Sequence, residues 1–117
     1  MVEVSNVRGQ RGVVRLCLTA SRDQFPDCGK GSRGADVAVA AGGVRHVFTG
    51  VRPGVYAIAA FHDINGDGKM DTVLGIPREG FAFSRNPGLR ARAPRFGEAS
   101  FDSGDGAVQQ LRMRYLL

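Results

Sequence analysis

Hydrophobic and polar positions alternate with a period of two along most of the chain. In residues 13–19, Val14, Leu16 and Leu18 fall on one side, with Arg15 and Cys17 on the other. This alternation is typical of half-buried β-strands, in which successive side chains point to opposite faces. The same kind of pattern predicts strands over six further segments: 2–7, 35–40, 44–49, 54–62, 98–102 and 111–116.

Two of these segments carry additional information about the fold. Residues 54–62 are apolar on both faces, which predicts a strand at the centre of a sandwich, and Pro53 with Gly54 supplies the turn before it. Residues 98–116 predict a strand–turn–strand unit rather than a helix, with the turn in the run SGDG. In its second strand, Leu111, Met113 and Tyr115 alternate with two outward arginines.

The pattern as a whole predicts an all-β fold. The 17 glycines suit many turns, and no convincing amphipathic helix is present; at most one helical turn is expected within 22–34 or 88–97. We therefore expect one domain over residues 1–117, a β-sandwich of about seven strands with prealbumin-like or immunoglobulin-like connections. Residues 63–97 are expected to form one long loop without strands, and a loop of that length is usually functional.

Composition and charge exclude some classes of function. The content of 43% hydrophobic and 23% charged residues is ordinary for a globular domain, and the longest apolar run, 55–61, is too short to span a membrane. The net charge is +5, but the basic residues are spread along the chain and no recognition motif accompanies them, so we expect no nucleic-acid partner. Locally, an acidic segment, 63–71, is followed by a basic one, 78–95.

The two cysteines, Cys17 and Cys28, fit no zinc-binding spacing. In an exported protein we expect a disulfide between them, whereas in a reducing compartment both would be free thiols.

The segment HDINGDGKMD, residues 62–71, has most features of a calcium loop. Oxygen ligands at alternate positions converge on one point, and Gly68 permits the sharp bend that an EF-hand loop also requires. The twelfth position is Leu74, so a sixth ligand has to come from elsewhere in the chain, with Glu79 the nearest candidate. The alternative is an Asx-rich turn without metal, but three crowded carboxylates favour a cation. The predicted Ca²⁺ ligands are Asp63, Asn65, Asp67, the carbonyl of Lys69, Asp71 and Glu79.

Residues 61–86, together with the later run PRFGEASFD, resemble the signature of a bacterial family known only as domain of unknown function 2141. The run VFTGVRPGVYAIAAF more distantly resembles carboxypeptidase-regulatory-like and transthyretin-like β-sandwich modules. The family resemblance implies an all-β protein exported to the periplasm or beyond, with a signal peptide removed before Met1, and it implies no activity. One departure is that Ala82 and Arg85 replace a glycine and an amide residue of the family's usual run.

Taken together, these features predict an exported binding or accessory module rather than an enzyme. Calcium would order a face that binds a surface component, a polysaccharide or a protein. The alternative is a protein that binds or transforms a small anion through His62, Glu79 and the arginines at 78 and 85. For His62 itself, a bond to a backbone carbonyl at the strand end is the simpler expectation. The candidate ligand-binding residues are His62, Arg78, Phe81, Phe83, Ser84, Arg85 and Asn86.

Overall fold

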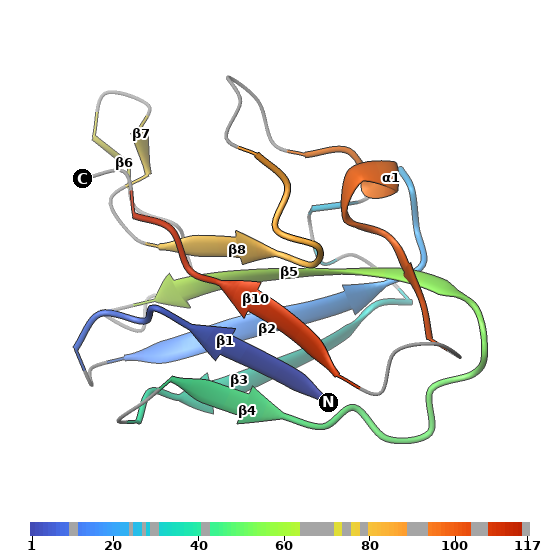
Figure 1. The fold of residues 1–117 in the computed structure, drawn as a ribbon, viewed down its shortest axis with the longest axis horizontal. Helices are drawn as coiled ribbons and strands as arrows, with labels where there is room; N and C mark the ends of the chain where they lie inside the picture. Colours follow the sequence, from blue (N-terminus) through green and yellow to red (C-terminus); the bar gives the residue numbers. More distant parts are fainter. Residues whose placement is uncertain are drawn as a thin grey trace.

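The computed structural model consists mainly of two β-sheets packed face to face, as Figure 1 shows. It describes residues 1–9, 12–23, 25–26, 28, 31–40, 43–63, 80–88, 94–103 and 108–115, and only the backbone of 72–73 and 76–77. The smaller sheet has the order β10-β1-β4; its strands are Gln109–Arg112, Val2–Ser5 and Val44–His46. The all-β sandwich predicted from the sequence is confirmed.

The larger sheet has the order β3-β2-β5-β8. These strands are Arg33–Ala38, Val13–Thr19, Val55–Asp63 and Phe81–Phe83. A two-residue strand, β9 (Phe101–Asp102), pairs with the start of β5. The short strands β6 (Thr72–Val73) and β7 (Ile76–Pro77) pair only with each other. The long strand β5 is therefore central, as its two apolar faces predicted.

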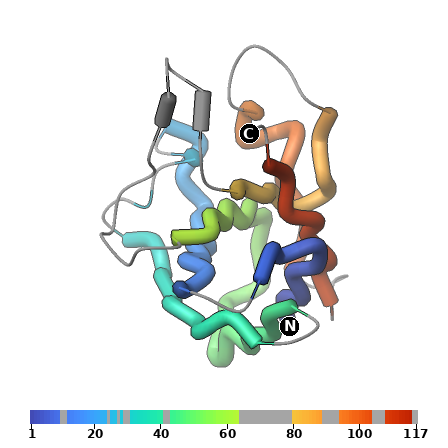
Figure 2. Tube along the Cα trace, turned by 90° about the vertical axis from the view of Figure 1, so that its left-hand side faces the viewer, coloured from blue at the N-terminus to red at the C-terminus, as the bar shows by residue number. Residues whose placement is uncertain are grey.

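The main core lies between the two sheets. Val14, Leu16 and Leu18 of β2 face Leu111 and Met113, which are 1% and 0% exposed. The predicted inward positions of both segments are thus confirmed. Figure 2 shows the sandwich from the side, with β1 and β10 across from β2 and β5.

A second apolar cluster lies on the opposite, outer face of the larger sheet. Phe25 packs edge-on against Phe83 and Phe96, at centroid distances of 5.8 and 6.1 Å. Ala57 of β5 and Ala99 are fully buried beneath these rings. The one helical turn, α1 (Phe96–Ala99), and the segment around Phe25 therefore cover one end of this face.

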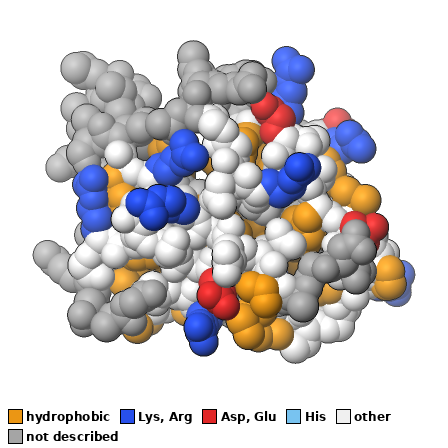
Figure 3. All heavy atoms as spheres, viewed as in Figure 1, with side chains coloured by type: hydrophobic (Ala, Val, Ile, Leu, Met, Phe, Trp, Pro, Cys, Tyr) orange, Lys and Arg blue, Asp and Glu red, His pale blue; other side chains and the backbone are white. Residues whose placement is uncertain are grey.

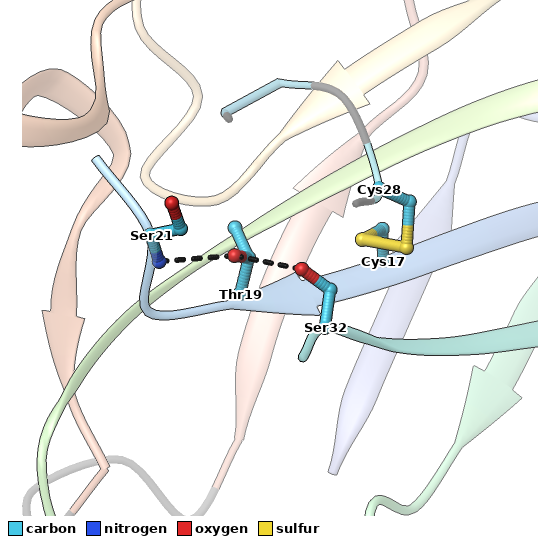
Figure 4. The surroundings of a disulfide bond; sticks show 5 residues. All are labelled: Cys17, Thr19, Ser21, Cys28 and Ser32. Atoms are coloured by element: carbon cyan, nitrogen blue, oxygen red, sulfur yellow. Dashed lines mark hydrogen bonds between the residues drawn. A yellow bond between two sulfur atoms is a disulfide. The ribbon is translucent and has the colours of Figure 1, made fainter. Parts of the chain in front are cut away.

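Cys17 and Cys28 form a disulfide, with their Cα atoms 5.7 Å apart. Figure 4 shows how it joins β2 to the segment that follows the strand. Beside it, the buried Thr19 hydroxyl accepts hydrogen bonds from the Ser21 amide (3.0 Å) and from the Ser32 hydroxyl (2.9 Å). The disulfide expected for an exported chain is present. The hydrogen bonds of Thr19 hold the start and the end of the same connection, which joins β2 to β3.

Three expectations about elements are corrected. The 63–97 segment is not free of strands, because β6, β7 and β8 lie within it. The expected strand at 98–102 is helical at Glu98 and Ala99, and only 101–102 is extended. Strands β9 and β10 do not pair with each other: β9 pairs with β5, and β10 pairs with β1 in the other sheet. The expected strand–turn–strand unit is therefore not a hairpin.

Candidate binding face and the base of the acidic loop

Asp63 is the last residue of β5, and the acidic segment begins with it. The residue is 0% exposed, and its Oδ2 accepts a hydrogen bond of 2.9 Å from Arg15 Nε. Arg15 also reaches Asp36 Oδ2 through Nη1, at 2.5 Å. A buried carboxylate needs such a partner, since the cost of removing an isolated charge from water is large. The first residue of the predicted calcium loop is therefore fixed to the neighbouring strand.

The strand register explains this arrangement. Arg15 of β2 lies directly opposite Asp36 of β3, and Asp63 lies diagonally across from it on β5. Diagonal neighbours on one sheet face are within reach of a long side chain. The hydrogen bond to Asp63 is the largest influence on Arg15 and raises its pKa; desolvation acts in the opposite direction, and Asp36 adds to the increase. Arg15 thus stays charged and bridges two carboxylates.

Most of the predicted calcium ligands cannot be placed. Of the six, only Asp63 belongs to the described residues; Asn65, Asp67, Lys69, Asp71 and Glu79 lie outside them. Within the described part of the chain, no three His, Cys, Asp or Glu side chains gather closely enough to hold a metal ion. The calcium site stays a prediction.

His62 forms hydrogen bonds through both its backbone and its side chain at the point where the acidic segment begins. We call this point the base of the acidic segment. Its backbone N–H donates to the Gly80 carbonyl at 2.8 Å, which joins the two ends of the 63–79 excursion. Its imidazole is 1% exposed and shares a 2.9 Å hydrogen bond between Nδ1 and the Tyr115 hydroxyl. The same hydroxyl accepts from the Arg8 amide at 2.8 Å. One side-chain contact of His62 is thus with a tyrosine that follows β10, and the bond to a backbone carbonyl stays a prediction.

Gly80 is the residue at which the excursion returns to the sheet, and it allows no side chain. A Cβ atom there would lie 2.5 Å from the Tyr115 ring and 2.7 Å from Met113 Cγ. Such distances require the ring or the backbone to move. The glycine therefore lets the returning chain pass directly over the Tyr115 ring.

Beside this base, three phenylalanines point to the outer face of the larger sheet. Phe61 of β5 lies opposite Phe81 of β8, and Phe83 lies two residues further along β8. All three are partly buried, and we call them the aromatic face. The Phe81 and Phe83 rings are 5.9 Å apart and tilted by 51°. The rings therefore do not form one flat platform.

Two other predicted ligand-binding residues bond the protein's own backbone. The Ser84 hydroxyl, 0% exposed, donates to the Ala99 carbonyl and accepts from the Ile58 amide. The Asn86 side chain donates to the Gln110 carbonyl at 3.1 Å and accepts from the Arg112 amide at 2.8 Å. These contacts join β8 and its turn to α1 and to the edge of β10.

The anion pocket expected from Arg78 and Arg85 stays a prediction, because only Arg85 belongs to the described residues. Arg85 is exposed, and its guanidinium lies 3.4 Å from the Ser100 carbonyl. Arg78 lies outside the described residues. The sequence analysis missed Arg15 and Asp36, because their proximity to Asp63 depends on strand register, which alternation alone does not supply.

The charged side chains of the described residues are distributed over the surface rather than concentrated. Figure 3 shows arginine side chains at several separate places on the face seen in Figure 1. On the outer side of the smaller sheet, Arg45 pairs in register with the acidic Glu3. The expectation that the protein has no nucleic-acid partner stays a prediction.

The family described as "Uncharacterized protein conserved in bacteria (DUF2141)" matches residues 2–110. The chain belongs to this family. The match covers nearly every strand described above and includes the acidic segment, so the DUF2141 signature and the sandwich coincide. No curated protein and no solved structure matches the chain. The more distant likeness to transthyretin-like modules stays a prediction. No helix within the described residues has the length and apolar character to cross a membrane.

Proposed function

We propose that this DUF2141 protein is an exported, non-catalytic binding module. The acidic segment that follows Asp63 takes Ca²⁺ in the periplasm or outside the cell, and the bound ion orders the segment next to the aromatic face. The partner is a component of the cell surface. The ion acts by neutralising crowded carboxylates, and it does not contact the partner.

The observation that carries this proposal is the two-sided base at His62. A loop with both ends fixed to the sandwich loses less conformational entropy when an ion orders it than a loop with free ends. The backbone bond from His62 to Gly80 and the ion pair of Asp63 with Arg15 supply such fixed ends. The residues between them include Asn65, Asp67 and Asp71, the oxygen ligands that Ca²⁺ prefers.

The aromatic face supports a protein partner over a polysaccharide. Sugar rings stack on flat aromatic surfaces, whereas Phe81 and Phe83 are tilted by 51° to each other. Partly exposed aromatic rings that meet at an angle suit apolar side chains, which are the usual anchors of protein interfaces. Neutral polysaccharide is the second candidate.

Calorimetric titration with Ca²⁺ tests the first half of the proposal. We expect saturable binding with a Kd of about 10⁻⁴ M, in the range of extracellular modules. Asp67→Ala should abolish it, whereas Asp23→Asn, which changes an exposed carboxylate outside the segment, should not. The absence of heat at millimolar Ca²⁺ in the unmutated protein would leave the metal-free Asx turn as the explanation of the segment.

Binding to isolated bacterial envelope fractions tests the second half. Retention should require Ca²⁺, should be lost in EGTA, and should fall for Phe81→Ala, whose backbone bonds to Arg114 are kept. Phe48→Ala, in an aromatic residue packed against the main core, is the matched control. Prior digestion of the fraction with protease or with glycosidases separates a protein partner from a polysaccharide. Retention that is unchanged both in EGTA and in Phe81→Ala would contradict the proposal.

A further inference from the structure

The sandwich has four strand edges, and two of them are closed by hydrogen bonds between the sheets. Phe81 of β8 exchanges backbone hydrogen bonds with Arg114, at 3.0 and 2.9 Å. The Asn86 side chain bonds the Gln110 carbonyl and the Arg112 amide on the edge of β10. A third edge, β4, is only three residues long. These are ordinary ways of protecting an edge from pairing with another chain.

The fourth edge, β3, is six residues long, and no other strand of the described residues pairs with its outer side. Val39, which follows β3, donates its N–H to the carbonyl of Gly12, which precedes β2, so these two residues form a hydrogen-bonded pair. Along an antiparallel ladder, such pairs alternate with pairs whose backbone groups point away from the partner strand. The backbone groups of Gly34, Asp36 and Ala38 therefore point away from β2. None of these three residues has another backbone partner in the described part of the chain.

We propose that the β3 edge is a docking site for an extended peptide segment that adds a strand to the larger sheet. Three N–H and three C=O groups supply the ladder, and this mode of recognition draws its affinity from such main-chain bonds. The site lies at the opposite end of the strand order from the aromatic face and does not depend on the function proposed above.

The side chains of β3 define the chemistry of the partner. Ala35 and Val37 pack against the main core, so a partner residue opposite either of them points towards apolar surroundings. Asp36 points to the outer face with its side chain 55% exposed. Arg15 divides its single positive charge between Asp36 and Asp63, so the exposed Asp36 carboxylate is only partly neutralised by it. The partner segment is therefore apolar–basic–apolar, with Lys or Arg opposite Asp36.

The same charge disfavours a second copy of this chain as the partner. A two-fold antiparallel pairing that used all three outward residues would place Asp36 directly opposite Asp36 of the second copy. Like charges directly opposite each other in a sheet are destabilising. The occupant is thus a different polypeptide with the complementary charge.

The test uses the whole protein and two capped peptides, Thr-Val-Lys-Val-Thr and the same peptide with Glu in place of Lys, followed by amide NMR shifts. We expect the Lys peptide to give saturable shifts that centre on Gly34, Asp36 and Ala38, and to bind more tightly than the Glu peptide. Asp36→Asn should weaken the Lys peptide by about 1.4- to 5-fold, the range of one cross-strand charge pair. Asp23→Asn, an exposed carboxylate outside β3, should leave binding unchanged.

A second variant keeps the proposal falsifiable if the charge effect is small. Ala38→Pro removes an outward N–H from an edge strand, a position where proline is tolerated, and should abolish binding while preserving the spectrum of the fold. Shifts that lie elsewhere or survive Ala38→Pro would overturn the docking site. Equal affinity for both peptides would overturn its basic partner. Concentration-dependent dimerisation that Ala38→Pro abolishes would identify a second copy as the occupant and overturn it likewise.

Discussion

Arg85 and Asn86 adopt the left-handed region of backbone conformation, with φ of 64° and 44°. Residues with a Cβ atom rarely do so, and asparagine is among the few that tolerate it. The turn they form is closed by the Asn86 amide donating to the Phe83 carbonyl at 3.1 Å. Arg85 thus carries a Cβ atom at a position of backbone strain.

Replacement of Arg85 by glycine is therefore expected to stabilise the protein by about 0.5–1 kcal/mol, since glycine reaches positive φ without a steric penalty. Arg85→Asn should give a smaller gain. Thermal or urea unfolding measures both. Arg85→Ala is the control, because it removes the same side chain but keeps Cβ; a gain as large as that of glycine would assign the effect to the arginine side chain and not to φ.

Tyr115 gives the protein a pH dependence at the alkaline end. Burial raises the pKa of Tyr115 above its ordinary value of 10.0, and the Arg8 amide and charge act in the opposite direction. Because the folded state holds this proton more tightly, the contribution to stability is complete below pH 10 and is lost as pH rises through the folded pKa.

Tyr115→Phe should flatten this alkaline decline in unfolding free energy. It should also cost about 1 kcal/mol at neutral pH, through the lost hydrogen bonds to His62 and Arg8. Urea unfolding at a series of pH values measures both effects. Tyr56→Phe, whose hydroxyl bonds only the exposed Arg52 carbonyl, should keep the decline. An unchanged slope in Tyr115→Phe would exclude Tyr115 as its source.

Inward and outward positions of single residues followed from alternation, while partners across the fold did not. Leu16 and Met113 are buried as the pattern predicted. The bonds from Asp63 to Arg15 and from His62 to Tyr115 join residues 48 and 53 positions apart. Such partners depend on strand register and on how the two sheets face each other, and neither is encoded in the local pattern.

At the scale of elements, the two longest strands were predicted most closely, whereas the short strand β8 was missed. The strand at 13–19 has the predicted bounds, and β5 is shifted by one residue from its predicted bounds. Both were recognisable because each has seven or more residues in which the distribution of apolar side chains can be followed. Strand β8 has three residues, and alternation over three positions is indistinguishable from chance. Its place beside β5 is decided by the Phe61–Phe81 and Ala60–Ala82 pairs, which are tertiary contacts.

The segment 98–102 was assigned to a strand for a related reason. The alternation pattern does not reveal the hydrogen bond that starts the helix here. The Glu98 carboxylate accepts from the Arg95 amide at 2.8 Å and caps the first turn of α1. Phe96 and Ala99, three residues apart, then face the same outer cluster. A helix of one turn carries too little periodicity to be recognised in the sequence.

The connection between β2 and β3 should depend strongly on its disulfide. Cys17 and Cys28 are 11 residues apart, and closing a loop of this size stabilises by about 3 kcal/mol. Cys17→Ala/Cys28→Ala should lower the unfolding free energy by about that amount, measured in urea, and loosen Phe25 over the outer cluster. Dithiothreitol should lower the stability of the unmutated protein and leave the double variant unaffected. A double variant as stable as the parent would show that Thr19 and its hydrogen bonds suffice.

At the scale of the whole molecule, the base of the acidic segment belongs to both sheets at once. His62 is part of β5 in the larger sheet, whereas Tyr115 continues the chain beyond β10 of the smaller one. Anything that orders the segment at this base is therefore coupled to the packing of one sheet on the other. Ion binding should consequently be visible in the global unfolding transition and not only in local signals.

Calcium is accordingly expected to raise the melting temperature of the entire domain. A ligand that binds only the folded state stabilises it by RT ln(1 + [L]/Kd), which is about 2.7 kcal/mol at a concentration 100 times Kd. With a Kd of about 10⁻⁴ M, this corresponds to roughly 10 °C at about 10 mM Ca²⁺ for a domain of this size. Asp67→Ala should remove the increase, and Asp23→Asn, in an exposed carboxylate outside the segment, should keep it. Gly80→Ala forces the Tyr115 ring to move and should therefore reduce the stability of the protein. It should also make the rise in melting temperature with Ca²⁺ smaller, because it loosens the base that couples the segment to both sheets. A calcium-dependent rise that persists in Asp67→Ala would place the ion elsewhere on the protein, and no rise in the parent would contradict the metal loop itself.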